Sequence, residues 1–153
     1  MTLIVEPGDP TAPGPATLLR ESHALMERMF PPEDNHYLSP DALKSPEIAF
    51  FVARDGGETL GTGALKNHGL YGEVKSMFVA ESARGRGIAN ALLRQIEDHA
   101  RALALPVIKL ETGNTLHAAH RLYTRHGFTP CGPFGDYVAN KTSAFMEKPL
   151  GDA

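Results

Sequence analysis

The segment 79–89, VAESARGRGIA, constrains the fold most, because it places an apolar strand end, a short turn and two arginines directly before an amphipathic helix. A helix N-terminus has about half a positive charge, so acidic side chains are favoured there. Arg84 and Arg86 occupy this place instead, which indicates that an anion binds beside them. Gly85 and Gly87 would let the backbone approach that anion. A phosphate or pyrophosphate suits the free N–H groups of the first helical turn.

The composition is ordinary for a globular protein and excludes several classes. The chain has 153 residues, 42% of them hydrophobic and 22% charged, which is enough for one domain over residues 1–153. A formal net charge of -3 argues against general nucleic-acid binding, which needs a basic face. No apolar run approaches the roughly 20 residues of a membrane helix. The N-terminus also has no signal-peptide pattern, so we expect no membrane partner and a cytoplasmic location.

Cysteine and histidine give no metal-site pattern. Cys131 is the only cysteine, which excludes an internal disulfide framework and a cysteine-rich zinc site. We expect it to be a buried strand residue. The seven histidines, His117 and His120 among them, have no ligand spacing that would indicate a metal. We therefore predict no metal site.

The hydrophobic periodicity predicts a mixed α/β sheet with helices between its strands. The strand of residues 73–79 and the strand of residues 107–111 flank a helical crossover, so we expect them to be parallel neighbours. The earlier strands form an antiparallel meander, with a hairpin signal at Asp55-Gly56-Gly57. Pro7, Pro10, Pro13 and Pro15 are expected to keep their segment free of regular structure. The expected strands are 2–6, 48–54, 59–66, 73–79, 107–111, 128–131 and 143–148, and the expected helices are 16–29, 88–103 and 116–126.

Two motifs stand in the order of a known family. RGRGIA at 84–89 fits the pattern Gln/Arg-x-x-Gly-x-Gly/Ala and follows a strand that ends in MFV. A second signature, Ala-x-x-Leu-Tyr-x-x-x-Gly-Phe, begins at Ala119. With the order of elements, these motifs make the chain resemble the GCN5-related N-acetyltransferase (GNAT) superfamily over nearly its whole length. The motif residues are Met77, Phe78, Val79, Arg84, Gly85, Arg86, Gly87, Ile88 and Ala89, then Ala119, Leu122, Tyr123, Gly127 and Phe128.

The resemblance implies a fold, a co-substrate and a reaction. The fold would be a GNAT fold, in which the strand ending at Val79 splays from its parallel neighbour. The freed backbone of Met77, Phe78 and Val79 would bind the pantetheine arm of acetyl-CoA, as an added strand would. The 84–89 segment would bind the pyrophosphate. The enzyme would then move the acetyl group to an amine of a small molecule by direct attack in a ternary complex.

The resemblance also implies a catalytic acid, and the sequence offers candidates for a base. Tyr123 would protonate the departing CoA thiolate; otherwise it is a half-buried aromatic with a solvated hydroxyl. Glu73 is the candidate general base, and by period two it would share a strand face with Lys75, Met77 and Val79. An ion pair with Lys75, or a place at an exposed strand start, explains Glu73 at least as well. Glu111 is a second acid near the centre of the sheet and a rival for the role of base.

Other features of the sequence leave alternatives open. Many GNAT enzymes have an asparagine seven residues before the tyrosine, and here that residue is Leu116. Aromatic residues in loops, namely His36, Tyr37, Phe134 and Tyr137, would border the acceptor pocket, where they either shape specificity or simply pack. A peptide or protein acceptor, a non-catalytic acyl-CoA sensor and a dinucleotide oxidoreductase remain as alternatives. Edge strands of this fold could also pair two chains into a homodimer.

Overall fold

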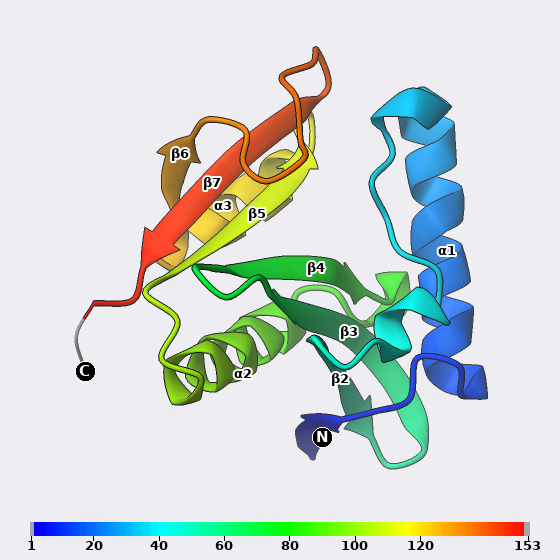
Figure 1. Cartoon of the computed structure of the whole chain (residues 1–153). Helices are drawn as coiled ribbons and strands as arrows, with labels where there is room; N and C mark the ends of the chain where they lie inside the picture. Colours follow the sequence, from blue (N-terminus) through cyan, green and yellow to red (C-terminus); the bar gives the residue numbers. More distant parts are fainter. Residues whose placement is uncertain (1, 152–153) are drawn as a thin grey trace.

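The computed structural model describes residues 2–151, in which three α-helices flank one seven-stranded sheet (Figure 1). The strand order is β1-β2-β3-β4-β5-β7-β6. The domain predicted over residues 1–153 includes residues 1, 152 and 153, which lie outside the described residues. The strands are β1 (Leu3–Pro7), β2 (Ile48–Asp55), β3 (Glu58–Asn67), β4 (Gly72–Val79), β5 (Val107–Gly113), β6 (Thr129–Cys131) and β7 (Ser143–Pro149). The helices are α1 (Pro13–Met29), α2 (Ile88–Ala102) and α3 (His117–Arg125), with short 3-10 turns η1 (Pro32–Asp34), η2 (Ala42–Lys44) and η3 (Glu81–Ala83).

The sheet is mixed and mostly antiparallel, which confirms the predicted fold class. Strands β1 to β4 form the expected meander, and β5, β7 and β6 also pair in antiparallel fashion. The pair β4–β5 is the parallel one in this sheet. Helix α2 provides the crossover between these two strands, so its first turn lies at the carboxyl end of β4.

Helix α1 begins earlier than the sequence predicted. We expected Pro13 and Pro15 to exclude regular structure, but α1 starts at Pro13. The first N–H groups of a helix have no intrahelical partner, so proline in the first turn removes no hydrogen bond. The prediction was therefore wrong for this pair of prolines. It was also wrong for Pro7, which ends the edge strand β1 and pairs with Phe51, whereas Pro10 lies in a turn.

Strands β4 and β5 pair over only three register positions before they separate. Gly72 pairs with Ile108, Glu73 with Lys109 and Val74 with Leu110. Beyond Val74, β4 and β5 both continue, but no further residues pair, and the two strands diverge in Figure 1. The splay that the resemblance implied is therefore present, and it leaves backbone groups of β4 without strand partners on the β5 side.

A β-bulge in β4 changes which side chains share a face. Thr62 pairs with Phe78 but Ala64 pairs with Lys75, so two residues of β4 face one residue of β3. Ser76 adopts a φ of 55° at this point, and its carbonyl accepts a hydrogen bond from the Thr62 hydroxyl at 2.8 Å. Met77 consequently packs against the core cluster around α2, whereas Lys75 lies on the opposite face.

The predicted common face of Glu73, Lys75, Met77 and Val79 is thus wrong, because the bulge breaks the period of two. Glu73 and Lys75 share one face, and Met77 and Val79 pack against the core on the other. The side chains that could do acid–base chemistry are therefore separated from those that pack beneath the sheet.

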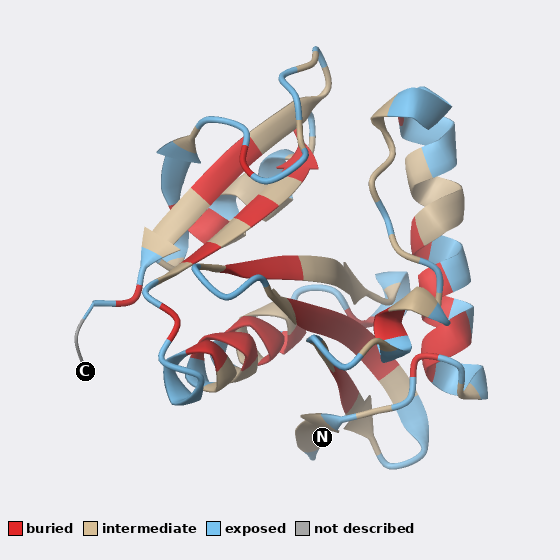
Figure 2. Ribbon diagram, viewed as in Figure 1, coloured by how far each residue is buried: buried red, intermediate tan, exposed pale blue. Residues whose placement is uncertain are grey.

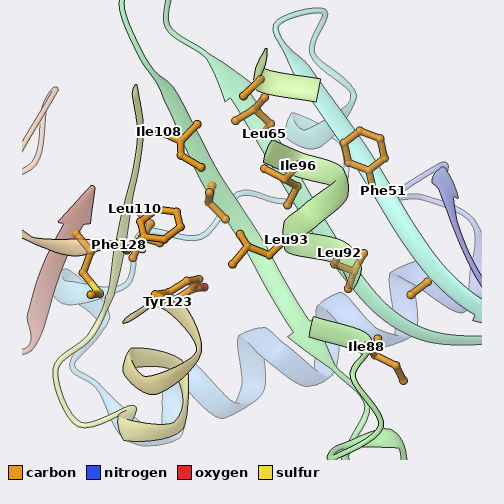
Figure 3. Close-up of a cluster of buried hydrophobic side chains, with 14 of the residues drawn as sticks. Phe51, Leu65, Ile88, Leu92, Leu93, Ile96, Ile108, Leu110, Tyr123 and Phe128 are labelled. Atoms are coloured by element: carbon orange, nitrogen blue, oxygen red, sulfur yellow. The ribbon is translucent and has the colours of Figure 1, made fainter. Parts of the chain in front are cut away.

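The main core lies between α2 and the sheet. Ile88, Leu92, Leu93 and Ile96 of α2 are fully buried there, and Figure 3 shows them against side chains of the sheet and of α3. A smaller cluster lies under α1. Figure 2 shows the buried residues of α1 and α2 in red. Cys131 differs from prediction: it lies in a strand, but β6 is a short edge strand and leaves the thiol half-buried. Burial still raises the pKa of this thiol.

Candidate active site

A cavity of about 160 Å³ opens where β4 and β5 part. Its walls come from α1, the segment 34–37, β4, β5, α3 and the β6–β7 loop (132–142). The splay of the strands makes this space, because it removes the backbone pairing that would close the sheet. The polar and aromatic groups on its walls include His36, Glu73, Lys75, Glu111, Tyr123 and Tyr137.

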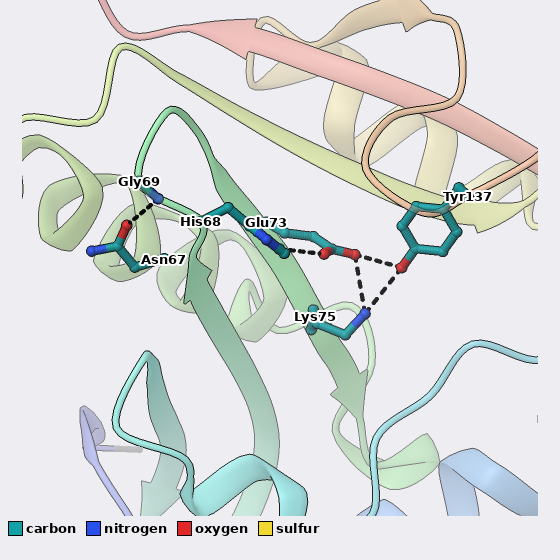
Figure 4. Close-up of polar contacts among 6 residues, drawn as sticks. All are labelled: Asn67, His68, Gly69, Glu73, Lys75 and Tyr137. Atoms are coloured by element: carbon teal, nitrogen blue, oxygen red, sulfur yellow. Dashed lines mark hydrogen bonds and ion pairs between the residues drawn. The ribbon is translucent and has the colours of Figure 1, made fainter.

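Glu73 is buried in a complete hydrogen-bond network (Figure 4). Its Oε2 accepts from the Tyr137 hydroxyl at 2.5 Å and from Lys75 Nζ at 3.0 Å, and its Oε1 lies 2.9 Å from His68 Nε2. Burial by itself raises the pKa of this carboxyl, but Lys75 and the hydrogen bonds from Tyr137, Lys75 and His68 together bring it below its usual range. Glu73 is therefore a firmly ionised carboxylate, and its predicted ion pair with Lys75 is present.

Glu111 has a different environment in the same cavity. Its Oε2 accepts one hydrogen bond, from the Ser143 hydroxyl at 2.7 Å. Burial raises the pKa of Glu111, and the opposing effects of Ser143, His36 and Lys75 do not cancel that rise. The two carboxyl groups thus differ in the direction of their pKa shifts, which is a common property of acid–base sites.

Tyr123 belongs to α3 and lines the cavity where β4 and β5 part. It packs edge to face with Phe128 in the main core, with a distance of 5.6 Å between ring centroids (Figure 3). The side chain is buried, rather than half-buried as expected, and its hydroxyl has no hydrogen-bond partner among the described residues. Burial, and then the nearby charge of Glu111, raises the pKa of Tyr123 well above its usual value. The phenol is therefore protonated at neutral pH.

Two loops that are far apart in the sequence meet over the cavity. The rings of His36 and Tyr137 pack edge to face, with 5.0 Å between centroids. The Thr142 hydroxyl donates to Asp34 Oδ2 at 2.7 Å, and this bond forms a second link between the same loops. His36, Tyr37 and Tyr137 line the cavity, as the sequence suggested for aromatic loop residues, whereas Phe134 packs behind Tyr137.

The hydroxyl of Tyr137 was not predicted as part of the site. It reaches Glu73 across 64 positions in the chain, and no periodic pattern reports such a contact. Burial and the charge of Glu73 raise the pKa of this phenol far above its usual range, so it acts as a donor to the carboxylate.

The loop before α2 has the geometry of an anion site. Gly85 and Gly87 adopt φ values of 79° and 77°, which glycine adopts most readily, and a side chain at either would meet open space. Gly87 is the N-cap, and no acidic residue lies in the first turn of α2. The guanidinium of Arg84 lies over the Phe78 ring, 5.8 Å from its centroid, and its Nε donates to the Val79 carbonyl at 3.4 Å. The backbone N–H groups of Ile88 and Ala89 therefore remain for a ligand.

Strand β4 ends at Val79, shortly before this loop. Val79 pairs with Gly61 on the β3 side, and the β5 side of the same stretch has no strand partner. Met77 lines the cavity between the splayed strands. An extended ligand that runs from the 84–89 loop into the cavity would thus pass the open edge of β4.

Comparisons with known proteins decide the family. The model of the acetyltransferase (GNAT) family matches residues 17–128. This chain belongs to the GNAT family. An IAA acetyltransferase of Azospirillum brasilense is 44% identical over 87% of this chain and 88% of its own length. The uncharacterised N-acetyltransferase YsnE of Bacillus subtilis is 38% identical, over 88% of this chain and 91% of its own.

Solved structures of GNAT proteins agree with this assignment. A protein of Klebsiella pneumoniae, named as a suspected acyl-CoA N-acyltransferase, has a TM-score of 0.82 and 30% identity and covers 98% of this chain and 99% of its own. The PaiA N-acetyltransferase of Thermoplasma acidophilum, solved with coenzyme A, has a TM-score of 0.76 at 14% identity, which shows the shared fold, and covers 97% of this chain and 99% of its own. The predicted enzyme class is confirmed: this GNAT protein is an acetyltransferase with acetyl-CoA as its co-substrate.

Two kinds of feature are absent from residues 2–151. No group of three or more histidine, cysteine, aspartate or glutamate side chains in this range could hold a metal ion. No helix in the same range has the length and apolar character to cross a membrane.

Proposed function

We propose that this GNAT enzyme transfers the acetyl group of acetyl-CoA to an amine of a small molecule by direct attack. The observation that supports this most is the cavity between β4 and β5, because it brings two carboxyl groups of different pKa and a protonated phenol to one space. The cavity holds only about 160 Å³, which suits a compact acceptor better than a folded protein. A 44% identical relative is named as an IAA acetyltransferase, so IAA belongs among the acceptors to test.

Acetyl-CoA would bind along the open edge of β4. The pyrophosphate would accept hydrogen bonds from the backbone of the 84–89 loop, where Arg84 and Arg86 add positive charge. The pantetheine amides would pair with the backbone of Met77, Phe78 and Val79, which has no strand partner toward β5. The thioester would then lie in the cavity, between Tyr123 of α3 and the carboxylates of Glu73 on β4 and Glu111 on β5.

The reaction needs two proton movements. The amine nitrogen attacks the thioester carbonyl carbon, the carbon–sulfur bond breaks, and the thiolate leaves. One group must take a proton from the nitrogen, and another must give one to the sulfur. Tyr123 is our proposed acid for the sulfur. Its raised pKa makes full transfer costly against a thiol near pKa 8.5, so the hydroxyl acts mainly as a hydrogen-bond donor while charge develops on sulfur.

Glu111 is the better base of the two carboxyls on physical grounds. A general base works best with a pKa near the operating pH, and burial raises the pKa of Glu111 toward that range. Glu73, the base predicted from the sequence, has its carboxylate engaged by three donors and a lowered pKa, which favours an electrostatic role toward an incoming ammonium. We propose Glu111 as base and retain Glu73 as the competing assignment.

A thiol-release assay with acetyl-CoA and a panel of amines, amino acids, polyamines and IAA tests this function. Turnover with a small amine supports it. Turnover with peptides alone would favour the peptide acetyltransferase. CoA binding with no turnover for any acceptor would favour the acyl-CoA sensor, and protection by NAD but not by CoA would favour an oxidoreductase. Pairing through the edge strands β1 or β6 into a homodimer stays a prediction that size-exclusion chromatography tests.

A further inference from the structure

Two hollows adjoin the loop before α2, which is the proposed pyrophosphate site. The first, which we call the Arg94 hollow, is lined by Gly87, Asn90 and Arg94 of the loop and α2, by Arg125 and His126 at the end of α3, and by Lys148 of β7, among others. The second, the Glu58 hollow, lies between α1 and the segment 78–84. Coenzyme A has a third phosphate, on the 3′ carbon of its ribose, beyond the pyrophosphate. Each hollow shares a residue with the 84–89 loop, Gly87 in the first and Arg84 in the second, so each is a candidate place for that dianion if the pyrophosphate binds at this loop.

The charges of the two hollows differ in sign. The Arg94 hollow has three permanent cations, Arg94, Arg125 and Lys148, against one carboxylate, Glu97. The Glu58 hollow has two cations, Arg28 and Arg84, against three carboxylates, Glu21, Glu58 and Glu81. A phosphate dianion is attracted to the first and repelled by the second.

The cations of the Arg94 hollow converge on one place. Burial lowers the pKa of His126, and Lys148, Arg94 and Arg125 each lower it further by their charge, against the opposite effect of Glu97. All three cations therefore lie close enough to act on one imidazole. The dipole of α3 explains a cation at Arg125, in the last turn of that helix, but it does not explain Arg94 in the middle of α2.

Two contacts hold the walls of this hollow in place. His126 Nε2 and Asn90 Oδ1 lie 2.8 Å apart, which links the end of α3 to the first turn of α2. Lys148 forms an ion pair with the buried Glu97, which links β7 to α2. Glu97 is thereby neutralised by Lys148, and the exposed guanidinium groups of Arg94 and Arg125 remain as the net positive charge.

We propose that Arg94 and Arg125 bind the 3′-phosphate of coenzyme A, so that the enzyme distinguishes CoA from 3′-dephospho-CoA. This inference rests on the proposed function, since it requires the pyrophosphate at the 84–89 loop. It assigns the Arg94 hollow to donor recognition, and among the residues that line this hollow only Gly87 is a fixed position of either motif. The acetyl-transfer chemistry itself takes place elsewhere, in the cavity between β4 and β5.

Calorimetric titration with CoA and with 3′-dephospho-CoA tests the assignment. The wild-type protein should bind CoA roughly tenfold more tightly than 3′-dephospho-CoA, in keeping with charge-assisted hydrogen bonds from exposed side chains. R94Q and R125Q should each weaken CoA binding by roughly three- to tenfold and leave 3′-dephospho-CoA binding within about twofold. R28Q, in the Glu58 hollow, is the matched control and should change neither affinity. Thermal melts show whether each variant is folded.

Each other outcome overturns a stated part of the account. Equal affinity of the wild-type protein for both ligands overturns the 3′-phosphate site, as does an equal loss of both affinities in R94Q and R125Q. Loss of discrimination in R28Q alone would place the phosphate in the Glu58 hollow. If the folded wild-type protein binds neither ligand, the proposed function itself fails, and this inference fails with it.

Discussion

Val74 of β4 and Leu110 of β5 form the last register pair between these parallel strands, and the cavity begins directly beyond them. Three residues after Leu110 the described β5 ends, while β4 bulges at Ser76 and turns away. The site therefore depends on the early end of strand pairing. Four elements (α1, α3, β4 and β5) and two loops then bring their side chains to the space that the missing pairs leave.

The pyrophosphate assignment predicts the effect of charge at Gly87. G87D and G87N add side chains of equal size, and both residues tolerate the left-handed conformation of this position. The aspartate should abolish the rise in melting temperature that CoA causes, whereas the asparagine should keep part of it. At about 100 times its Kd, a ligand of the native state adds about 2.7 kcal/mol to the free energy of unfolding. An equal rise in melting temperature with CoA in both variants would contradict binding of the pyrophosphate at this loop.

The acid assignment predicts a specific kinetic loss in Y123F. The turnover number should fall by roughly a hundredfold or more, with a smaller change in the KM for acetyl-CoA, because the hydroxyl is needed mainly in the transition state. The melting temperature should not fall, since the hydroxyl has no partner among the described residues and only the ring packs on Phe128. Acyl donors with a better leaving thiol should recover part of the loss. A wild-type turnover number would refute the role.

Much of the fold could be predicted from the sequence, because it depends on local patterns. The apolar stripe of α2 and the turn at Gly56 and Gly57 placed their elements correctly. The bulge at Ser76 could not be predicted, since one extra residue in a strand leaves no trace in composition. The hydrogen bond between Tyr137 and Glu73 could not be predicted either, because it joins a loop to a strand through tertiary packing.

The two carboxyls of the cavity should have opposite effects on stability. Folding raises the pKa of Glu111, so its ionised form costs stability once the pH rises through the folded-state pKa. E111Q should therefore raise the melting temperature at pH 7, and this gain should vanish as the pH falls below the unfolded value of about 4.3. Folding lowers the pKa of Glu73, so its ionised form stabilises the fold above that unfolded value. This stabilisation is lost as the pH falls through the folded-state pKa.

E73Q is thus the matched control for E111Q. It should lower the melting temperature at pH 7, and the two variants should converge in acid. If Glu111 is the base, E111Q should also reduce the turnover number more than E73Q, with a loss that shrinks at high pH where free amine is abundant. The opposite ranking would return the role of base to Glu73.

The link between Tyr137 and Glu73 predicts a change in the acceptor site. Y137F keeps the ring contacts with His36 and Phe134 but removes the bond to Glu73 and the acceptor for Lys75. The free energy of unfolding should fall by about 1 kcal/mol, the usual contribution of such a bond. The KM for the acceptor should rise while the affinity for CoA stays unchanged. Y37F is the control, because its hydroxyl bonds Glu27 at the surface. Equal effects of both substitutions would exclude a specific role for Tyr137.

The most direct measurement is the identity of the product. The purified enzyme, acetyl-CoA and the amine panel should release CoA thiol above the background rate, and mass spectrometry should find one acetyl group on the amine nitrogen of at least one small acceptor. Y123F and G87D in parallel should reduce that product strongly. No acetylated small amine, from a folded enzyme that binds CoA, would contradict the account.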